Sequence, residues 1–244
     1  MARPVDIIIL PNAEAVVREA AGRIAHLVET AHQAKKPFHL VLSGGATPKR
    51  LYEILAKRTM QSDVAWDHVH FYWGDERCVG PEHSDSNYKM AYDALLSKIN
   101  IPASHIHRMQ GEGDPEQSAQ DYETILRGVP LFDLVLLGMG ADGHTASLFP
   151  ETQALKERTK WVVANFVPKL EAVRLTLTPV ILNQATNILF LVAGGDKAKT
   201  VKAVLDGPYN PDLLPAQLIR KETGKVTWII DEAASACCSS AIKE

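Results

Sequence analysis

The sequence predicts an α/β fold in which a doubly wound, mostly parallel sheet carries helices on both faces. Short, continuously apolar runs recur along the 244 residues, and segments with apolar residues at helical spacing separate most of them. Several of these runs end in glycine-containing turns that lead into a helix. Strands that alternate with helices form parallel sheets, because each helix returns the chain to the edge where the previous strand began.

The elements follow one another in a regular order. Strands rich in aliphatic and aromatic residues are expected near 5–10, 38–42, 69–73, 134–137, 161–166, 171–177, 188–192 and 226–231. Helices are expected near 13–34, 48–58, 87–97, 115–127, 179–185 and 197–206. A short connection joins the strands at 161–166 and 171–177, so we expect this pair to run antiparallel at an edge of the sheet. No repeat, low-complexity tract or linker interrupts the pattern, and residues 1–244 are expected to form a single domain.

The composition favours a globular protein that acts on a small molecule. Apolar residues make up 46% of the chain and charged residues 23%, which is ordinary globular usage. The net charge of −3 argues against a nucleic-acid-binding surface, because such surfaces carry basic clusters. The apolar run Val5–Leu10 is too short for the core of a signal peptide, and no segment is expected to span a membrane. The sequence leaves the assembly open between a monomer and a homodimer.

The three cysteines do not form a disulfide framework. Cys237 and Cys238 are neighbours in the sequence and Cys78 stands alone, so we expect a reducing, cytoplasmic environment. Cys78 follows Arg77 and could serve as a thiolate nucleophile. No base lies near it in the sequence, which favours an incidental thiol.

The most informative motif is the strand near 134–137 and the turn that follows it. Three glycines surround Asp142 and His144 in this turn. Ligands of open α/β sheets bind at the carboxyl ends of the strands, which is where these two side chains are expected. Histidine is suited to general acid or base chemistry near neutral pH. The alternative is a histidine that caps a helix or binds a turn carbonyl.

A second motif resembles a cradle for an anion. An apolar strand ends in Ser43, Gly44 and Gly45, and Thr47 and Pro48 are expected to be the N-cap and first residue of the next helix. Unpaired backbone N–H groups at a helix start attract phosphate, especially where no side chain shields them. The motif is neither a dinucleotide-binding fingerprint nor a Walker loop. A tight strand-to-helix turn that merely requires glycine is the alternative.

A third strand, near 69–73, ends in a glycine followed by Asp75, Glu76 and Arg77. Three adjacent charged residues are not expected in a protein core. The alternative to a functional role for them is a solvated turn with a local ion pair. Because three strands deliver polar groups at equivalent ends, the fold is expected to gather them in one cleft.

Two cations in the second half of the chain complete the set. Arg174 shares one face of the strand near 171–177 with Thr176 and Thr178, and Lys197 follows the strand near 188–192 at a turn. Arginine offers a planar donor fork to phosphate and lysine a compact charge. For either residue taken alone, a surface salt bridge is the commoner use.

These motifs, at 42–48, 73–79 and 138–150, closely resemble those of the 6-phosphogluconolactonase family. The match stays in register through Arg174 and the stretch 194–197. The resemblance implies a Rossmann-like fold shared with sugar-phosphate isomerases and deaminases. It also implies hydrolysis of 6-phospho-D-glucono-1,5-lactone to 6-phosphogluconate in the oxidative pentose phosphate pathway, with no metal and no organic cofactor.

The resemblance assigns roles to individual residues. It makes His144 the base that activates water, Arg77 a substrate-binding cation, and Arg174 and Lys197 phosphate contacts. The chemistry agrees, because one imidazole can take a proton from water and return it to the leaving ring oxygen. Either Asp142 or Asp75 could orient that imidazole, and the sequence leaves the choice open. No G-x-S-x-G motif is present, which favours direct attack by water.

Two other functions remain as alternatives. A sugar-phosphate isomerase or deaminase needs a carboxylate base, and in the deaminases an Asn-Glu pair follows the strand-end histidine. Leu148 and Phe149 occupy the corresponding positions here, which weakens this alternative, although Asp75 and Asp142 remain as candidate bases. A non-catalytic sugar-phosphate sensor is the other alternative, but such modules are usually joined to a further domain.

Overall fold

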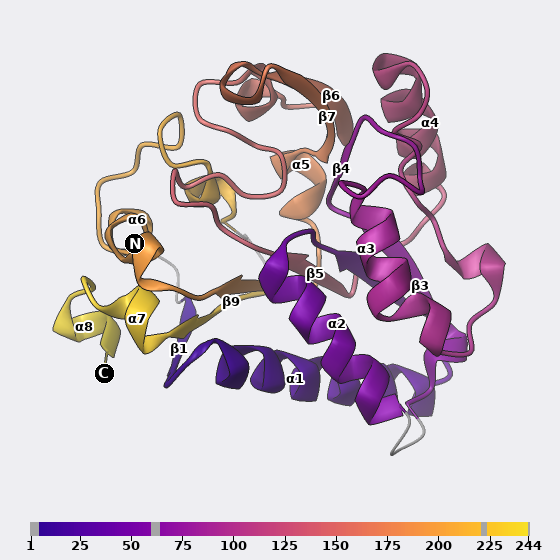
Figure 1. Ribbon diagram of the computed structural model, residues 1–244, viewed down its shortest axis with the longest axis horizontal. Helices are drawn as coiled ribbons and strands as arrows, with labels where there is room; N and C mark the ends of the chain where they lie inside the picture. Colours follow the sequence, from indigo (N-terminus) through magenta and orange to yellow (C-terminus); the bar gives the residue numbers. More distant parts are fainter. Residues whose placement is uncertain (1–4, 60–63, 221–223, 244) are drawn as a thin grey trace.

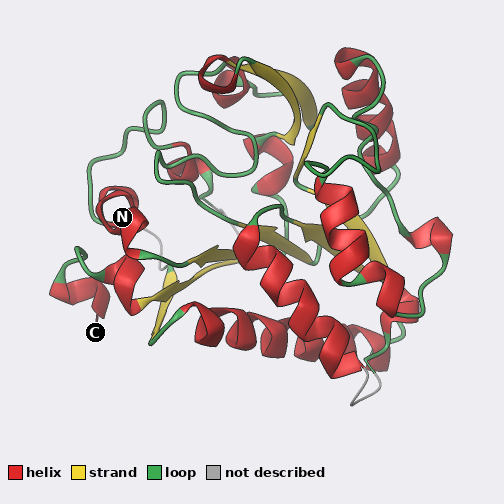
Figure 2. Ribbon diagram, viewed as in Figure 1, coloured by secondary structure: helices red, strands yellow, loops and turns green. Residues whose placement is uncertain are grey.

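A six-stranded parallel sheet forms the centre of the computed structural model, which describes residues 5–59, 64–220 and 224–243 (Figures 1 and 2). Its strands are, in spatial order, β1 (Asp6–Leu10), β9 (Lys225–Asp231), β8 (Asn187–Val192), β5 (Leu134–Leu137), β2 (Phe38–Leu42) and β3 (Val69–Trp73). Every neighbouring pair is parallel. The predicted doubly wound α/β fold is confirmed, and the predicted bounds of these six strands agree with the structure to within one residue.

The strand order explains where a ligand can bind. The chain moves from β1 to β2 to β3 in one direction and then returns through β5, β8 and β9 in the other. Because crossovers between parallel strands are right-handed, the two directions place their connections on opposite faces of the sheet. The direction reverses between β2 and β5, and ligands of doubly wound folds bind at such a reversal.

The helices are α1 (Ala13–Gln33), α2 (Ala46–Thr59), α3 (Asn87–Ala94), α4 (Pro115–Arg127), α5 (Pro179–Leu182), α6 (Ala198–Leu205), α7 (Glu232–Ser235) and α8 (Ser240–Lys243). In Figure 1, α1 and α2 lie side by side below the sheet. The prediction of Thr47 as the N-cap of α2 is wrong. The helix begins at Ala46, and the carbonyl of Gly45 accepts its first hydrogen bond from Lys49 N at 3.0 Å.

The helix begins early because Gly45 has a φ of 99°, a conformation that reverses the chain directly after the Ser-Gly turn. Four predicted helices are shorter than expected. The helix expected at 13–34 ends at Gln33, and the one at 87–97 gives way to a 3₁₀ turn at Leu96–Lys98. The one at 179–185 stops at Leu182, and the one at 197–206 spans Ala198–Leu205.

A second sheet lies above the first and consists of β4 (Asp75–Arg77), β7 (Ala172–Leu177) and β6 (Val162–Val167) (Figure 1). The predicted antiparallel pairing of β6 with β7 is confirmed, but their predicted place at an edge of the main sheet is wrong. They pair instead with β4. Gly74 makes the corner between the sheets, because its N–H donates to Leu42 O at 2.9 Å and its carbonyl accepts from Leu177 N at 2.8 Å.

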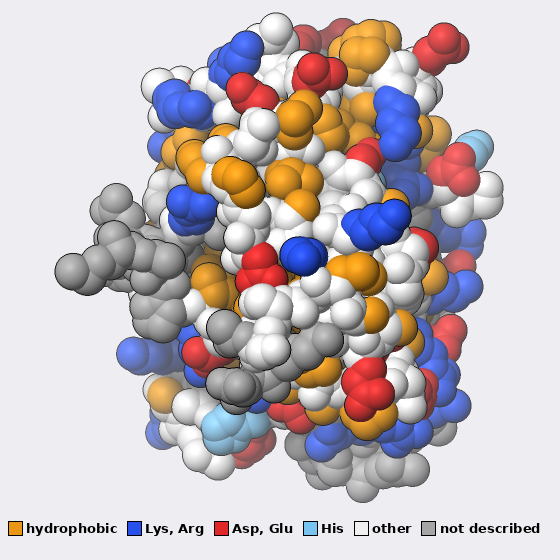
Figure 3. Space-filling model, turned by 90° about the vertical axis from the view of Figure 1, so that its left-hand side faces the viewer, with side chains coloured by type: hydrophobic (Ala, Val, Ile, Leu, Met, Phe, Trp, Pro, Cys, Tyr) orange, Lys and Arg blue, Asp and Glu red, His pale blue; other side chains and the backbone are white. Residues whose placement is uncertain are grey.

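Charges of both signs are spread over the face shown in Figure 3, where Lys and Arg side chains alternate with Asp and Glu. The described residues of this face carry no continuous basic field of the kind that binds nucleic-acid phosphates. Among the described helices, none combines the length and the apolar character needed to cross a membrane.

A cluster of stacked rings lies beside the edge strand β3. His70 stacks on His105 with ring centroids 3.9 Å apart, and Tyr72 stacks on His107 at 4.6 Å. The Nδ1 atom of His70 lies 3.2 Å from Nε2 of His107. Burial lowers the pKa of His39, which stacks on the same cluster, and that of His107. Burial, together with the neighbouring imidazoles, lowers the pKa of His70 to about 4.

These depressed values predict loss of stability in acid. The unfolded chain takes up protons on its imidazoles near the reference pKa of about 6.5, whereas folded His70 does so only near 4. The unfolded state therefore binds more protons in this window, and the free energy of unfolding should fall as the pH is lowered from about 6.5 to 4. Urea unfolding at several pH values measures this fall. In H70F the free energy of unfolding should fall less steeply with pH than in the wild type. Replacement of the exposed His26 by asparagine should leave the pH dependence unchanged. The same pH dependence in H70F and the wild type would contradict the prediction.

Candidate active site

The turns that follow β2, β5 and β8 border a cleft of about 220 Å³ together with β4. The predicted site residues that line it are Ser43, Gly44, Gly45, Asp75, Arg77, His144 and Lys197. Two more lie directly behind this lining: Asp142 contacts His144, and Arg174 is paired with Arg77 across β4 and β7. The structure thus brings together the nine residues that the sequence predicted for the site.

Two side chains hold the imidazole of His144 in place. Its Nδ1 lies 2.5 Å from Oδ1 of Asp142, and its ring stacks on Phe149 with centroids 4.1 Å apart. Lys169 donates to the other oxygen of Asp142 at 2.8 Å. The hydrogen bonds from His144 and Lys169 hold the pKa of Asp142 well below its usual range, against the opposing effect of burial. Asp142 is therefore an anion at neutral pH, and the carboxylate that contacts the imidazole is Asp142 rather than Asp75.

The glycine turn leaves room for this imidazole. A Cβ atom at Gly140 would overlap Cε1 and Nδ1 of the His144 ring. The close approach of backbone and ring, rather than an unusual φ, accounts for glycine at this position; of Gly138, Gly140 and Gly143, only Gly143 has a positive φ.

The anion cradle is a rigid turn with two open donors. Ser43 exchanges two hydrogen bonds with the buried Tyr52, whose hydroxyl accepts from Ser43 N at 2.9 Å and donates to Ser43 O at 2.8 Å. The backbone N–H groups of Gly44 and Gly45 make no hydrogen bond within the described chain. They lie at the start of α2, where the helix dipole favours an anion.

Asp75 is buried and contacts polar side chains rather than the imidazole. Its carboxylate accepts from Ser147 Oγ at 2.7 Å and from Asn87 Nδ2 at 3.3 Å. Asn87 also donates to the backbone carbonyl of Asp75 at 2.9 Å, and a Cβ at Gly44 would overlap the Asn87 amide. Asp75 and Asn87 thus fix the position of β4 relative to the anion cradle.

Glu76 has a structural place that the sequence did not reveal. The prediction that the three adjacent charges avoid the interior is wrong, because Glu76 is only 2% exposed and Asp75 is also buried. The Glu76 carboxylate accepts from the backbone N–H groups of Arg77, Asn87 and Tyr88 at 2.7–2.8 Å. Burial raises the pKa of Glu76, and these hydrogen bonds oppose the shift. Glu76 therefore fastens the start of α3 to β4.

Two arginines face the same region. Arg77 lines the cleft, and its Nη1 donates to the carbonyl of Asp85 at 2.5 Å. Arg174 stands opposite Arg77 in the β4–β7 ladder. Burial and the charge of Arg77 lower the pKa of Arg174. Two like charges side by side in half-buried positions would be stabilised by a bound anion.

Burial raises the pKa of the Cys78 thiol, which disfavours the reactive thiolate. This agrees with an incidental role for Cys78.

A second hollow, of about 420 Å³, lies between α4 and β6, and its charged lining residues are Glu116, Glu151, Glu157 and Lys160. The three carboxylates outnumber the one lysine, which suits an anionic ligand poorly. The cleft at His144 is therefore the better candidate for a phosphorylated substrate.

Sequence reasoning missed Lys169, Asn87, Ser147 and the stacking role of Phe149. Lys169 belongs to a 3₁₀ turn, Pro168–Leu170, between β6 and β7, and nothing in its neighbourhood marks it. In the sequence, Asn87 and Ser147 are ordinary polar residues within turn-rich segments. Only the packing of the second sheet against the first brings them to the site.

Comparison with known proteins identifies relatives of the chain. The family model described as glucosamine-6-phosphate isomerases/6-phosphogluconolactonase matches residues 11–228. The chain is 37% identical to the 6-phosphogluconolactonase of Haemophilus influenzae over 220 residues, 89% of this chain and 94% of that one. It is 37% identical to the 6-phosphogluconolactonase of Synechocystis over 243 residues, 96% of this chain and 98% of that one.

Solved structures share the fold. The 6-phosphogluconolactonase of Trypanosoma brucei, 27% identical, superposes with a TM-score of 0.84 and covers 96% of this chain and 98% of its own. A monomeric glucosamine-6-phosphate deaminase, 23% identical, superposes with a TM-score of 0.83 over 96% of this chain and 100% of its own, which shows the common fold.

Proposed function

Because the chain belongs to the family of glucosamine-6-phosphate isomerases and 6-phosphogluconolactonases, we propose that it hydrolyses 6-phospho-D-glucono-1,5-lactone to 6-phospho-D-gluconate in the oxidative pentose phosphate pathway. The observation that carries the proposal is the Asp142–His144 pair, which faces a cleft whose other walls hold an anion cradle and cations. A base and an anion site in one cleft are what a phosphorylated lactone requires.

In this mechanism, His144 accepts a proton from a water molecule as the water oxygen attacks the lactone carbonyl. The C–O bond to the ring oxygen then breaks, and the imidazolium returns its proton to that oxygen. Asp142 holds the ring orientation and stabilises the imidazolium, as a buried carboxylate does in other histidine-based hydrolases. The hydrogen bond from His144, aided by that from Lys169, keeps the pKa of Asp142 low and the carboxylate ionised. No metal and no organic cofactor takes part in these steps.

The phosphate is held on the other side of the cleft. The N–H groups of Gly44 and Gly45 donate to its oxygens, and Lys197 supplies a charge from the turn after β8. Arg77 contacts the sugar end of the substrate. Arg174 adds to the positive potential beside Arg77 and contributes to phosphate binding.

We further propose that residues 1–244 act as one catalytic domain, as a monomer or homodimer in the cytoplasm. The described cysteines are all free, which agrees with a reducing compartment. Cell fractionation and analytical ultracentrifugation test the location and the assembly.

The direct test is hydrolysis of freshly made phosphogluconolactone, corrected for spontaneous ring opening. We expect a large preference for the 6-phosphorylated lactone over gluconolactone. Alanine at Lys197 or Arg174 should weaken substrate binding by about 1–3 kcal/mol for each charge-assisted hydrogen bond that the substitution removes. The effect should appear mainly in KM for the phosphorylated lactone. Equal kcat/KM for the two lactones would contradict the proposed phosphate site.

Assays of the same purified protein distinguish a lactonase from a sugar-phosphate deaminase or isomerase. Leu148 is fully buried and Phe149 stacks on His144, so neither position supplies the acid that a deaminase requires. The protein should therefore release no ammonia from glucosamine 6-phosphate and should exchange no solvent deuterium into sugar phosphates. Either reaction at a rate comparable to lactone opening would overturn the proposal.

A further inference from the structure

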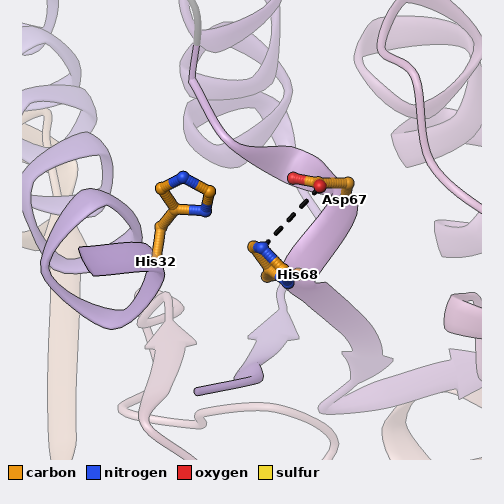
Figure 4. Close-up of side chains that lie close together, drawn as sticks. All are labelled: His32, Asp67 and His68. Carbon is orange, nitrogen blue, oxygen red and sulfur yellow. Dashed lines mark ion pairs between the residues drawn. The ribbon is translucent and has the colours of Figure 1, made fainter. Parts of the chain in front are cut away.

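A group of side chains that could bind a metal ion lies away from the cleft. His32 is in the last turn of α1, and Asp67 and His68 belong to the 3₁₀ helix η1 (Trp66–His68), which leads into β3. The three residues offer one ligand atom each, and these atoms all lie within 4.8 Å of one another. Figure 4 shows the His32 ring and the Asp67 carboxylate converging on the side of the His68 ring.

The spacing is close to that of a zinc site. Zn²⁺ binds histidine nitrogen and carboxylate oxygen at about 2.0–2.2 Å, which in a tetrahedron places ligand atoms about 3.3–3.6 Å apart. His68 Nε2 lies 3.7 Å from Asp67 Oδ2, and the rings of His32 and His68 have centroids 4.8 Å apart. The side chains of His68 and Asp67 are 41% and 60% exposed. They therefore have room for the small rotations that would close the site.

An independent observation points to a ligand here. The Nδ1 atom of His32 is buried, yet it has no hydrogen-bond partner in the part of the chain that the structure describes. Buried polar atoms are nearly always paired, and an unpaired one destabilises the folded protein. A metal bond to this nitrogen would satisfy it.

We propose that His32, Asp67 and His68 bind one Zn²⁺ ion. Two imidazoles and one carboxylate suit zinc, whereas Mg²⁺ and Ca²⁺ prefer oxygen ligands throughout. Water completes the coordination from the exposed side. The proposed zinc site and the proposed lactonase activity do not depend on one another.

The position of the proposed zinc site indicates that the ion has a structural role. α1 ends, and β3 begins, at the edge of the sheet opposite to the carboxyl ends of the strands, where the cleft lies. The ion joins the end of the longest described helix to the start of an edge strand. Since it binds the folded protein and not the dispersed chain, it raises the stability of the fold.

The test begins with full-length protein freed of metal by a chelator and titrated with zinc sulfate in a calorimeter. We expect one ion per chain. At a free zinc concentration about 100-fold above the Kd, the melting temperature should rise by roughly 5–10 °C. The initial rate of lactone hydrolysis at 25 °C should be the same with and without zinc.

Three variants separate this site from the other histidines. H32F keeps the ring in place against His68 but removes the nitrogen, and it should abolish the zinc-dependent rise in melting temperature. D67N, at an exposed position that the fold tolerates, should weaken zinc binding by at least tenfold. H26N, an exposed histidine on the same helix, should bind zinc like the wild type. Zinc binding that survives unchanged in H32F and D67N, or no binding at all to the wild type, would overturn the proposal.

Discussion

Replacing His144 by alanine is expected to lower kcat/KM for lactone hydrolysis by about 10²–10⁴-fold, the usual contribution of a general base. The fold should survive, because the side chain is partly exposed at the cleft and makes its contacts with Asp142 and Phe149 only at the surface of the core. Initial rates, corrected for spontaneous hydrolysis, and circular dichroism measure the two effects. A chelator should leave the wild-type rate unchanged.

The pH profile identifies the base. Protonated His144 cannot accept a proton from water, so kcat/KM of the wild type should fall as the pH is lowered. The pKa of Asp142 lies well below its usual range, so this carboxylate stays ionised in the same window and does not produce the fall. The acid limb should be absent from the residual activity of H144A. Near-normal turnover with an unchanged limb would place the base elsewhere, with Asp75 the next candidate.

Alanine at Gly140 should be nearly as damaging as the loss of the imidazole itself. The added methyl group would overlap Cε1 and Nδ1 of His144 and crowd the nearer oxygen of Asp142, so the ring must leave its position. A displacement of about 1 Å in a catalytic group costs on the order of 10² in rate. We expect the loss in kcat/KM to be of at least that size, with the protein still folded.

Gly80 provides a control outside the cleft. Apart from its chain neighbours, no heavy atom lies within 4 Å of a Cβ built on Gly80, and its φ is not positive. G80A should therefore keep activity close to that of the wild type. Equal activity of G140A and the wild type would show that the position of the His144 ring is not critical for the reaction.

The sequence was sufficient to predict the main sheet because its strands are buried on both faces. Such strands are short apolar runs between turns, and their limits coincide with changes in composition. The three-residue strand β4 could not be predicted in this way. It consists of Asp75, Glu76 and Arg77, and its conformation depends on pairing with β7, about a hundred positions later in the chain.

The same distinction applies to the candidate site. Glycine turns at strand ends identified His144, Asp142 and the anion cradle, because turn chemistry is local. Lys169 and the zinc ligands were not identified, since their significance arises from contacts between distant segments: Asp142 lies 27 positions before Lys169, and His32 lies on a different element from Asp67. The choice between Asp75 and Asp142 likewise required the three-dimensional structure.

The position of the first strand has a consequence for biosynthesis. Within the described chain, β1 pairs with β9 alone, so a strand that ends at residue 10 has no partner until the strand that begins at residue 225 has left the ribosome. At a translation rate of about 5–20 residues per second, this delay is roughly 10–40 s. During that time β1 presents unpaired backbone groups and an apolar surface to chaperones and to other nascent chains. Messages truncated before β9 should therefore yield chains that are captured or degraded rather than smaller folded proteins.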